Sequence, residues 1–446
     1  MLSDVIAAIS TPVGRSAIAV IRVSGRGAFH VAARVLDPFH PERDRRATRT
    51  RVVHPTTRDV IDDALCVAFP APHSYSGEDM VEISTHGGVL VPTETLAALL
   101  AAGARLATAG EFTRRAVLNG KLDLLQAEAV GDLIEATAPA QRRAALGQLD
   151  RGLSARIEKL RNQVLDLEAL ISYEIDFPEE DSGPVPPERI NAAVGELCGA
   201  LENLSRTAAE GERLREGALV VIAGRPNTGK SSLFNALVGR DRAIVTDVPG
   251  TTRDAIEAPI SCDGFPFNLV DTAGLRSTDD QIERMGVEVS RRYLDGADLV
   301  LYCAEAGEDL QVGERDFLKQ FEGKVVVVRT KTDLTPTSAG QEGIPTSALS
   351  GEGLPELRTE MARFAFAVLS CRADVEPLVT RERHRAALAH ALEETVAFRE
   401  ARASGIEGAV AAIHLRAAVG ALEAIVGVVT VDDVLDRLFS SFCVGK

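Results

Sequence analysis

A glycine-rich segment between an apolar run and a helix-forming run constrains the fold more than any other feature of the chain. The residues ALVVIA, 218–223, lead into GRPNTGKS, 224–231, and SLFNALVG follows directly. This order matches the pattern GxxxxGK[ST], in which glycines let backbone N–H groups point at an anion. Lys230 would neutralise phosphate charge, Ser231 would offer a hydroxyl to Mg²⁺, and the helix start would add its positive dipole end. The segment predicts a phosphate-binding loop.

Two later segments carry other groups that a nucleoside triphosphate with Mg²⁺ requires. DTAG, 271–274, closes an apolar strand. That position places the Asp271 carboxylate near the metal and Gly274 where the backbone must approach the γ-phosphate. GTTRD, 250–254, supplies hydroxyls, and Thr252 is the expected second Mg²⁺ contact. Taken alone, GTTRD is as typical of a surface turn closed by a side-chain hydrogen bond.

Guanine is the expected base. TKTD, 330–333, follows the apolar run KVVVV, and the carboxylate of Asp333 can accept hydrogen bonds from the ring N–H and the amino group of guanine. Adenine lacks this pair of donors. The pattern usually begins with Asn, and Thr330 departs from it, although a hydroxyl also donates and accepts. Ser347 and Ala348, after the last expected strand, would complete the pocket through backbone N–H groups.

The segment after DTAG lacks a familiar catalytic group. Many small GTPases use a Gln soon after this motif to orient the attacking water. Here the residue that follows Gly274 is Leu275, so hydrolysis must take its polar group from elsewhere. Asp279, Asp280 and Glu283 are available, although acidic residues at a helix start are often only solvated charges.

The charge balance restricts how the chain could contact nucleic acid. Its 446 residues carry 65 acidic and 49 basic side chains, a formal net charge of −16. Because broad phosphate contact needs clustered Lys and Arg, any RNA contact must be local. The arginine-rich residues 41–58 are one candidate, and a solvated loop is an equally good interpretation.

Composition also bears on the compartment. The first residues lack a basic and apolar leader, and the apolar stretch 409–431 is interrupted by His414, Arg416 and Glu423, which favours buried helices over a membrane span. Six cysteines without CxxC spacing indicate neither a disulfide framework nor a zinc site. These features predict a cytoplasmic protein without a membrane partner.

The chain divides into three kinds of sequence. Residues 1–118 alternate short β-type runs with helical segments and predict a small α/β domain. Residues 119–214 and 373–446 predict an all-α domain split in sequence, and 215–372 predict an inserted Ras-like α/β P-loop GTPase domain with a parallel sheet. One long helix is expected to carry an apolar face made of Leu146, Leu149, Leu153, Ile157, Leu160, Val164, Leu167 and Ile171.

Several segments together resemble one family. GRPNTGKSS, TDVPGTTRD and DTAGLR lie in the inserted domain, and VIRVSG, YSGEDMVEISTHGG, GEFTRRAVLNGKLDLLQAEAV, YEIDFPEED and FCVGK lie outside it. A GTP-binding domain alone would be generic, whereas the flanking segments are specific. The chain resembles the tRNA modification GTPases of the MnmE (TrmE) family over essentially its whole length.

The resemblance implies a GTP-hydrolysing enzyme that acts with a flavin-dependent partner, MnmG (GidA), which would hold FAD. Together they would place a carboxymethylaminomethyl group on carbon 5 of the wobble uridine of certain tRNAs. A reduced folate, 5-formyl- or methylene-tetrahydrofolate, would supply one carbon. The N-terminal domain would be folate-binding-like and would form a homodimer, and the partner would join it in a heterotetramer-type complex.

The resemblance also implies a folate site. Arg22, Glu82, Lys121 and Lys446 match the family positions that contact folate. Cations suit the glutamate tail of a folate and a carboxylate suits its pterin ring, although a structural ion pair is the competing explanation for each residue. Cys443, in FCVGK, is either a reactive thiol or a packed one.

For the GTPase domain the resemblance implies hydrolysis stimulated by potassium when two such domains meet. Asn227, Thr246, Val248 and Thr251 would hold the K⁺ ion, and Glu283 would orient the attacking water. The residues expected to bind GTP are Asn227, Thr228, Gly229, Lys230, Ser231, Ser232, Thr246, Asp247, Val248, Pro249, Gly250, Thr251, Thr252, Asp271, Thr272, Ala273, Gly274, Thr330, Lys331, Asp333, Ser347 and Ala348.

Two alternatives stay open. One is a ribosome-assembly or RNA-binding switch, in which GTP controls docking without modification chemistry. Such proteins usually add a basic RNA-binding module or a second GTPase unit, and the sequence shows neither. The other is a nucleotide-driven regulator whose flavin partner performs most of the chemistry.

Overall fold

The computed structural model describes residues 4–41, 45–176, 186–241, 257–271, 291–337, 340–370 and 378–427, and near the C-terminus 435, 438–440, 442 and 444–445. The chain divides into two compact units. Unit 1 is Met1–Gly131 with Val426–Lys446, and unit 2 is Asp132–Ile425. The fold is multidomain and half helical, as expected from the sequence, and it contains two mixed sheets. The four domain limits given above stay a prediction.

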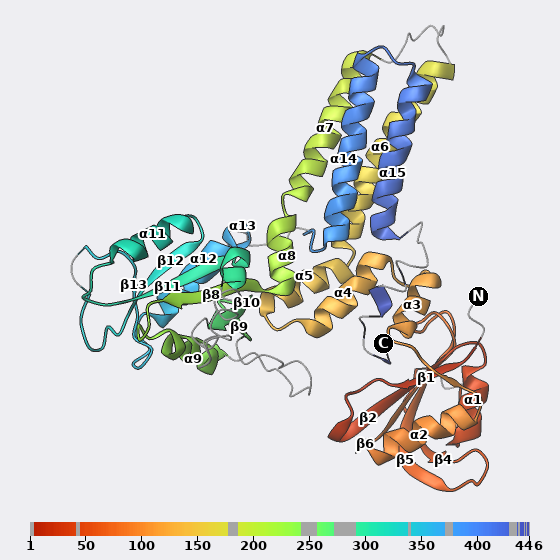
Figure 1. Ribbon diagram of the computed structural model, residues 1–446. Helices are drawn as coiled ribbons and strands as arrows, with labels where there is room; N and C mark the ends of the chain where they lie inside the picture. The colour runs from red at the N-terminus through yellow and green to blue at the C-terminus, as the bar shows by residue number, and fades with distance from the viewer. Residues whose placement is uncertain are drawn as a thin grey trace, which may run out of the picture. The chain divides into compact units, whose positions relative to one another are not determined.

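Unit 1 contains a seven-stranded sheet in the order β3-β4-β5-β6-β2-β1-β7 (Figure 1). Alternate residues of the central strands β2 and β6, such as Ile21 and Val81, are fully buried and pack with Leu99 of α2. The elements of this unit are β1 (Ile6–Ile9), β2 (Gly14–Ser24), α1 (Ala28–Val35), β3 (Leu36–Asp37), β4 (Thr48–Val53), β5 (Val60–Phe69), β6 (Met80–Gly88), α2 (Leu90–Ala101), β7 (Arg105–Leu106) and α3 (Glu111–Leu118). Helix α4 (Leu124–Glu135) follows.

The arginine-rich residues 41–58 are not all loop, as one interpretation of the sequence had it. Residues 48–53 form β4, which pairs antiparallel with β5, whereas 45–47 and 54–58 are turns and loop. Arg49 lies 3.3 Å from Asp63, and Arg58 lies 2.8 Å from Asp37. Charge patterning missed this strand because its acidic partners lie elsewhere in the sequence. These two arginines are therefore partly neutralised within the domain.

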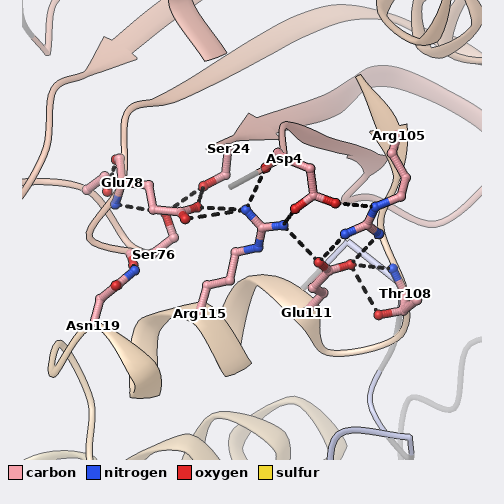
Figure 2. A network of polar contacts seen from close by, with 10 residues as sticks. Asp4, Ser24, Ser76, Glu78, Arg105, Thr108, Glu111, Arg115 and Asn119 are labelled. Atoms are coloured by element: carbon pink, nitrogen blue, oxygen red, sulfur yellow. Dashed lines mark hydrogen bonds and ion pairs between the residues drawn. The ribbon is translucent and has the colours of Figure 1, made fainter. Parts of the chain in front are cut away.

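A buried arginine connects four segments of unit 1 (Figure 2). The Arg115 side chain is 1% exposed, and its guanidinium donates to the Asp4 carboxylate at 2.9 Å and to Glu111 at 2.9 Å. It also donates to Glu78 at 3.1 Å. Arg105 donates to both oxygens of Glu111, at 2.7 Å to Oε1, which Arg115 also binds, and at 3.0 Å to Oε2. Each carboxylate in this network faces at least one guanidinium. The network fixes α3 against the start of β1 and the loop before β6.

The C-terminal residues that the structure describes complete unit 1. Val444 forms an antiparallel bridge with Ala109, and the Ser10 hydroxyl donates to the Gly445 carbonyl oxygen at 2.9 Å. Phe439 packs with Leu124 in a separate apolar cluster. The last residues of the chain therefore return to the N-terminal sheet, at the end of β1.

The helical part of unit 2 is a bundle of four long helices (Figure 1). They are α6 (Gly152–Asp176), α7 (Pro187–Ser205), α14 (Glu382–Ala403) and α15 (Gly408–Val426), preceded by α5 (Pro139–Leu149) and joined by α8 (Ala208–Glu216). The expected apolar face is buried from Leu153 to Ile171. The prediction of one helix through Leu146 is wrong, because Leu146 is 42% exposed on α5 and Arg151, with φ of 66°, separates α5 from α6.

Helix α15 is long and apolar enough, by length and composition, to cross a membrane. In the structure it is a member of the bundle. Leu415 and Leu422 are fully buried, and Arg416 lies 2.7 Å from Glu168 and Glu423 2.6 Å from Arg161, both on α6. The charged residues that interrupt the apolar stretch therefore bind this helix to its neighbour.

The inserted domain contains a six-stranded sheet in the order β13-β12-β11-β8-β10-β9. Strands β8, β10, β11, β12 and β13 are parallel to their neighbours, as expected, but the edge strand β9 is antiparallel to β10 and was missed. Its elements are β8 (Ala218–Gly224), α9 (Lys230–Asp241), β9 (Glu257–Cys262), β10 (Phe265–Asp271), β11 (Leu299–Glu305), α11 (Val312–Gln320), β12 (Val325–Thr330), β13 (Ile344–Pro345), α12 (Leu354–Ala365) and α13 (Ala367–Ser370).

The core of the inserted domain continues into two helices of the helical part. Ala140 and Ala144 of α5 and Leu214 of α8 belong to the same buried cluster as Phe267 and Leu301 of the sheet. The Ala140 N–H donates to the carbonyl oxygen of Gly264, in the β9–β10 turn, at 2.9 Å. The chain enters and leaves the insert at one place, because the Val379 N–H donates to the Thr207 hydroxyl at 3.1 Å.

Candidate nucleotide and folate sites

The phosphate-binding loop joins the C-terminal end of β8 to the start of α9 (Figure 1). Gly224, Asn227 and Gly229 have φ of 141°, 64° and 84°. A side chain at Gly224 would lie 2.4 Å from the carbonyl oxygen of Cys303, so the loop can pass β11 only with glycine there. The Thr228 hydroxyl donates to the Arg225 carbonyl oxygen at 2.9 Å and closes the curl.

The expected cation begins α9, and the expected carboxylate ends β10, the strand next to β8. Lys230 is 9% exposed, and its ammonium donates to the carbonyl oxygens of Gly224 and Arg225 at 3.0 and 2.6 Å. Asp271 is 8% exposed and lies beside Ile222 of β8 in the parallel register. Burial raises the pKa of the Cys303 thiol to about 12; the charge of Asp271 also raises this pKa, and the charge of Lys230 lowers it. Both charges therefore act on one buried atom behind the loop.

Thr330 connects the base-binding segment to the phosphate-binding loop. Its side chain is 5% exposed, and its hydroxyl lies 2.7 Å from the Thr228 carbonyl oxygen and 3.3 Å from that of Ala304. A hydroxyl carries one proton, so it donates to the nearer oxygen, that of Thr228. Although Thr330 departs from the usual Asn, it therefore still donates to the loop.

The two segments expected to surround the base are hydrogen-bonded to each other. The Ser347 hydroxyl donates to Asp333 Oδ1 at 2.6 Å, and Ser347 is fully buried while Asp333 is exposed. Lys331, with φ of 59°, forms an ion pair with Glu305 at the end of β11. Because Asp333 is exposed, its carboxylate can be reached by a pair of donors such as those of guanine.

The predicted folate residues lie on the sheet of unit 1. Arg22 and Glu82 are opposite each other on β2 and β6, with Nη2 of the arginine 2.7 Å from Oε1 of the glutamate. The Arg22 guanidinium lies 5.3 Å from the ring centre of Tyr75 and 5.7 Å from that of Phe112. Lys121 packs against Gly77 in the loop that carries Tyr75. Among the described contacts, none joins Lys121 to the arginine or the glutamate.

Part of the predicted site lies outside the described residues. The structure describes Asn227, Thr228, Gly229, Lys230, Ser231, Ser232, Asp271, Thr330, Lys331, Asp333, Ser347 and Ala348 of the nucleotide set and Arg22, Glu82 and Lys121 of the folate set. Thr246, Asp247, Val248, Pro249, Gly250, Thr251, Thr252, Thr272, Ala273, Gly274, Glu283, Cys443 and Lys446 lie outside it, and their roles stay predictions.

Comparison with known proteins decides the family. A family model described as the MnmE helical domain matches residues 124–443, and one described as the GTP-binding protein TrmE N-terminus matches residues 5–121. The chain is 39% identical to the tRNA modification GTPase MnmE of Moorella thermoacetica over 100% of both chains. It is 43% identical to that of Thermus thermophilus, over 100% of this chain and 99% of the relative, and 39% identical to that of Aquifex aeolicus, over 100% of both.

The chain belongs to the MnmE family of tRNA modification GTPases. It is accordingly a GTPase, and GTPases of this kind bind GTP with Mg²⁺. The described residues fit an MnmE site for that pair. Ser231 is exposed in the first turn of α9, and Lys230 and Asp271 supply charge of each sign at the start of α9 and the end of β10. Within the described part no cluster of three or more His, Cys, Asp or Glu could hold a metal.

One set of residues in this MnmE-type site was missed from the sequence. Arg225, the second residue of the phosphate-binding loop, directs its guanidinium to Glu308 at 2.7 Å and to Glu314 at 3.0 Å. The acidic partners lie more than eighty positions later in the chain, and nothing local marks them. The one available signal was the sequence QVGE, 311–314, which is typical of a helix start.

Proposed function

We propose that this protein uses GTP hydrolysis in the modification of carbon 5 of the wobble uridine of certain tRNAs, together with an MnmG-type partner that holds FAD. The observation that carries the proposal is the identity of 39% and 43% to tRNA modification GTPases over the whole chain. The product would be a carboxymethylaminomethyl group. The proposed compartment is the cytoplasm.

The N-terminal sheet supports a reduced folate as the one-carbon donor. Arg22 and Glu82 place a cation and a carboxylate next to each other beside two aromatic rings. A pterin ring could stack on an aromatic side chain while the charged groups bind its polar edge and the glutamate tail. The return of Gly445 to the end of β1 supports a role for the C-terminal segment here, because Arg22 lies opposite Ala8 of the same strand.

An exposed apolar patch supports a homodimer formed by the N-terminal domain. Val13, Ile18, Val89 and Leu90 are 60–67% exposed and lie at one end of the β2–β6 pair, where Gly14 pairs with Gly88. Exposed apolar residues gathered in this way often mark a protein interface. A heterotetramer-type complex with the flavin-dependent partner is part of the same proposal.

The loop geometry supports a potassium ion as an additional cation at the phosphates. Asn227 is exposed at the tip of the phosphate-binding loop and holds a left-handed conformation, φ 64°. With oxygens of Thr246, Val248 and Thr251 it would form a set of hard ligands, which suits K⁺. Glu283 would orient the attacking water, in place of the Gln that Leu275 excludes. Two GTPase domains would meet to complete this arrangement.

The alternative, a GTP-controlled switch in ribosome assembly or RNA binding, has less support. Two arginines of the arginine-rich stretch are paired with Asp63 and Asp37, which leaves less free positive charge for RNA. tRNA would then contact either a small basic surface on this acidic chain or a surface of its partner.

Nucleoside analysis of tRNA tests the proposed function. In cells that lack the gene, the modified wobble uridine should be absent, and the parent gene should restore it. We expect the Arg22→Ala variant to fail to restore it while the purified variant still hydrolyses GTP, because Arg22 lies in the N-terminal sheet and not in the GTPase domain. An Arg49→Ala variant is the matched control, since Arg49 is a mostly exposed arginine of the same sheet. An unchanged wobble uridine in the deletion strain would overturn the proposal.

Purified protein tests the potassium proposal. We expect GTP hydrolysis to be at least about tenfold faster in KCl than in NaCl, because a fixed cation at the phosphates stabilises the charge of the transition state. The Glu283→Ala variant should bind a fluorescent GDP analogue like the parent but hydrolyse GTP slowly in both salts. Equal rates of the parent in the two salts would refute the role of potassium, and loss of nucleotide binding in the variant would assign Glu283 a structural role.

A further inference from the structure

The Arg225 side chain contacts two carboxylates, one on α11 and one just before it. Its Nε donates to Glu314 Oε1 at 3.0 Å, and its Nη2 lies 2.7 Å from Glu308 Oε2. The two carboxylates bind different nitrogens of the guanidinium, so they fix its plane as well as its position. One residue of the phosphate-binding loop is thereby attached to a neighbouring helix.

Glu314 is a buried anchor and not a surface partner. It is 5% exposed, and its Oε1 also accepts a hydrogen bond from the Tyr302 hydroxyl at 3.0 Å. Its Oε2 accepts from the backbone N–H of Gln311 at 2.7 Å, in the capping box that starts α11. Burial alone would raise the pKa of Glu314, but these hydrogen bonds and Arg225 hold it below its usual value. The carboxylate is therefore charged and fixed by three donors.

The backbone of the same arginine holds Lys230 of the phosphate-binding loop. The Arg225 carbonyl oxygen accepts from Lys230 Nζ at 2.6 Å and from the Thr228 hydroxyl at 2.9 Å. A rotation of this peptide group would move both contacts together. The side chain and the carbonyl group of Arg225 thus connect a buried carboxylate on α11 to the ammonium group of Lys230.

We propose that Glu314 is a positioning residue for GTP hydrolysis, which acts through Arg225 to set where Lys230 meets the nucleotide. The inference rests on the assignment of GTP to this loop and is independent of the tRNA chemistry. Many backbone N–H groups hold the nucleotide in the ground state, whereas charge shifts between the β- and γ-phosphates only during reaction. A misplaced lysine should therefore lower kcat more than nucleotide affinity.

A double-mutant cycle on the full chain tests this inference. The variants are Glu314→Gln, Arg225→Met and the two combined, each measured for kcat, for the affinity of a fluorescent GDP analogue and for Tm. Removing a positioned donor outright costs about 10²–10³ in kcat, and these changes only displace one, so we expect each single change to lower kcat about tenfold, with the affinity within about threefold of the parent. The double variant should be no slower than Arg225→Met alone, because both changes break one connection.

Two further variants, together with the parent's own rate, decide between the possible outcomes. An Arg363→Met, Glu360→Gln double variant, which removes an exposed ion pair of α12, should leave kcat unchanged. Tyr302→Phe, which removes one donor to Glu314 and keeps the ring, should lower kcat by a smaller factor and replaces Glu314→Gln if that variant does not fold. The inference would be overturned if Glu314→Gln had the kcat of the parent, or if Tyr302→Phe did where it replaces that variant. Strictly additive effects in the cycle would also overturn it. The parent's own rate tests the GTPase assignment, and the ratio of variant to parent tests the positioning role.

Discussion

Replacing Asp333 by Asn is expected to change the base preference of the nucleotide site from guanine toward xanthine. The carboxylate offers only acceptors, and its Oδ1 already accepts from Ser347 at 2.6 Å. An amide in the same place presents a donor to the donor groups of guanine, whereas xanthine has a carbonyl group where guanine has its amino group. A pocket with mismatched hydrogen-bonding groups rejects a substrate by a factor of up to about 10⁴. We therefore expect KM for GTP to rise at least about a hundredfold.

Steady-state hydrolysis of GTP and XTP measures this effect. The Asp333→Asn variant should hydrolyse XTP at a rate comparable with that of the parent on GTP. Ser347→Ala is the matched control, because it removes the hydroxyl that holds Asp333 but leaves the carboxylate and hence the preference for guanine. If the Asp333→Asn variant uses GTP as well as the parent does, Asp333 does not bind the base.

Replacing Arg115 by Met is expected to destabilise unit 1 by about 3–5 kcal/mol, the usual cost of leaving buried charges without their partner. The side chain is 1% exposed and contacts Asp4, Glu78 and Glu111 (Figure 2). A methionine fills similar space but leaves these carboxylates to repel one another. Urea unfolding followed by circular dichroism measures the loss. Arg105→Met is the matched control, because Arg105 is 42% exposed and its removal should cost about 1 kcal/mol.

The same network sets the acid stability of this unit. Burial alone would raise the pKa of Glu111, but hydrogen bonds from Arg105, the Thr108 backbone and Arg115 lower it from 4.5 to about 2. Because the pKa is lower in the folded state, the network stabilises the fold above about pH 4.5 and loses this contribution as the pH falls toward 2. A Glu111→Gln variant should show a flatter pH dependence there. An Arg115→Met variant as stable as the parent at pH 7 would show that the network contributes little.

The sequence was sufficient to predict where the residues of local motifs lie in the fold. The phosphate-binding loop and the base segment each need particular residue types at fixed spacing, and Lys230, Asp271 and Asp333 lie where their motifs predicted them. Contacts between distant segments could not be predicted in this way. Arg225 and Glu314 form a pair only because β8 lies next to β11, the strand that precedes α11, and no spacing rule connects them.

Two errors in the fold have physical causes. The helical periodicity continues from Leu146 through Arg151 to Leu153 although the backbone turns at Arg151, so spacing alone could not separate α5 from α6. Strand β9 carries Pro259 and few apolar residues, so its own sequence does not indicate a strand. It becomes a strand because it pairs with β10 across a short turn. In both places tertiary contacts override the local pattern.

The single place where the chain enters and leaves the inserted domain has a consequence for how the host is built. Helix α7 ends at Ser205 and α14 begins at Glu382, and the hydrogen bond between Thr207 and Val379 brings these ends together. The two helices therefore form a hairpin whose connecting turn is an entire GTPase domain. A domain can be exchanged at such a point, or removed and replaced by a few residues, without changing the path of the helices that carry it.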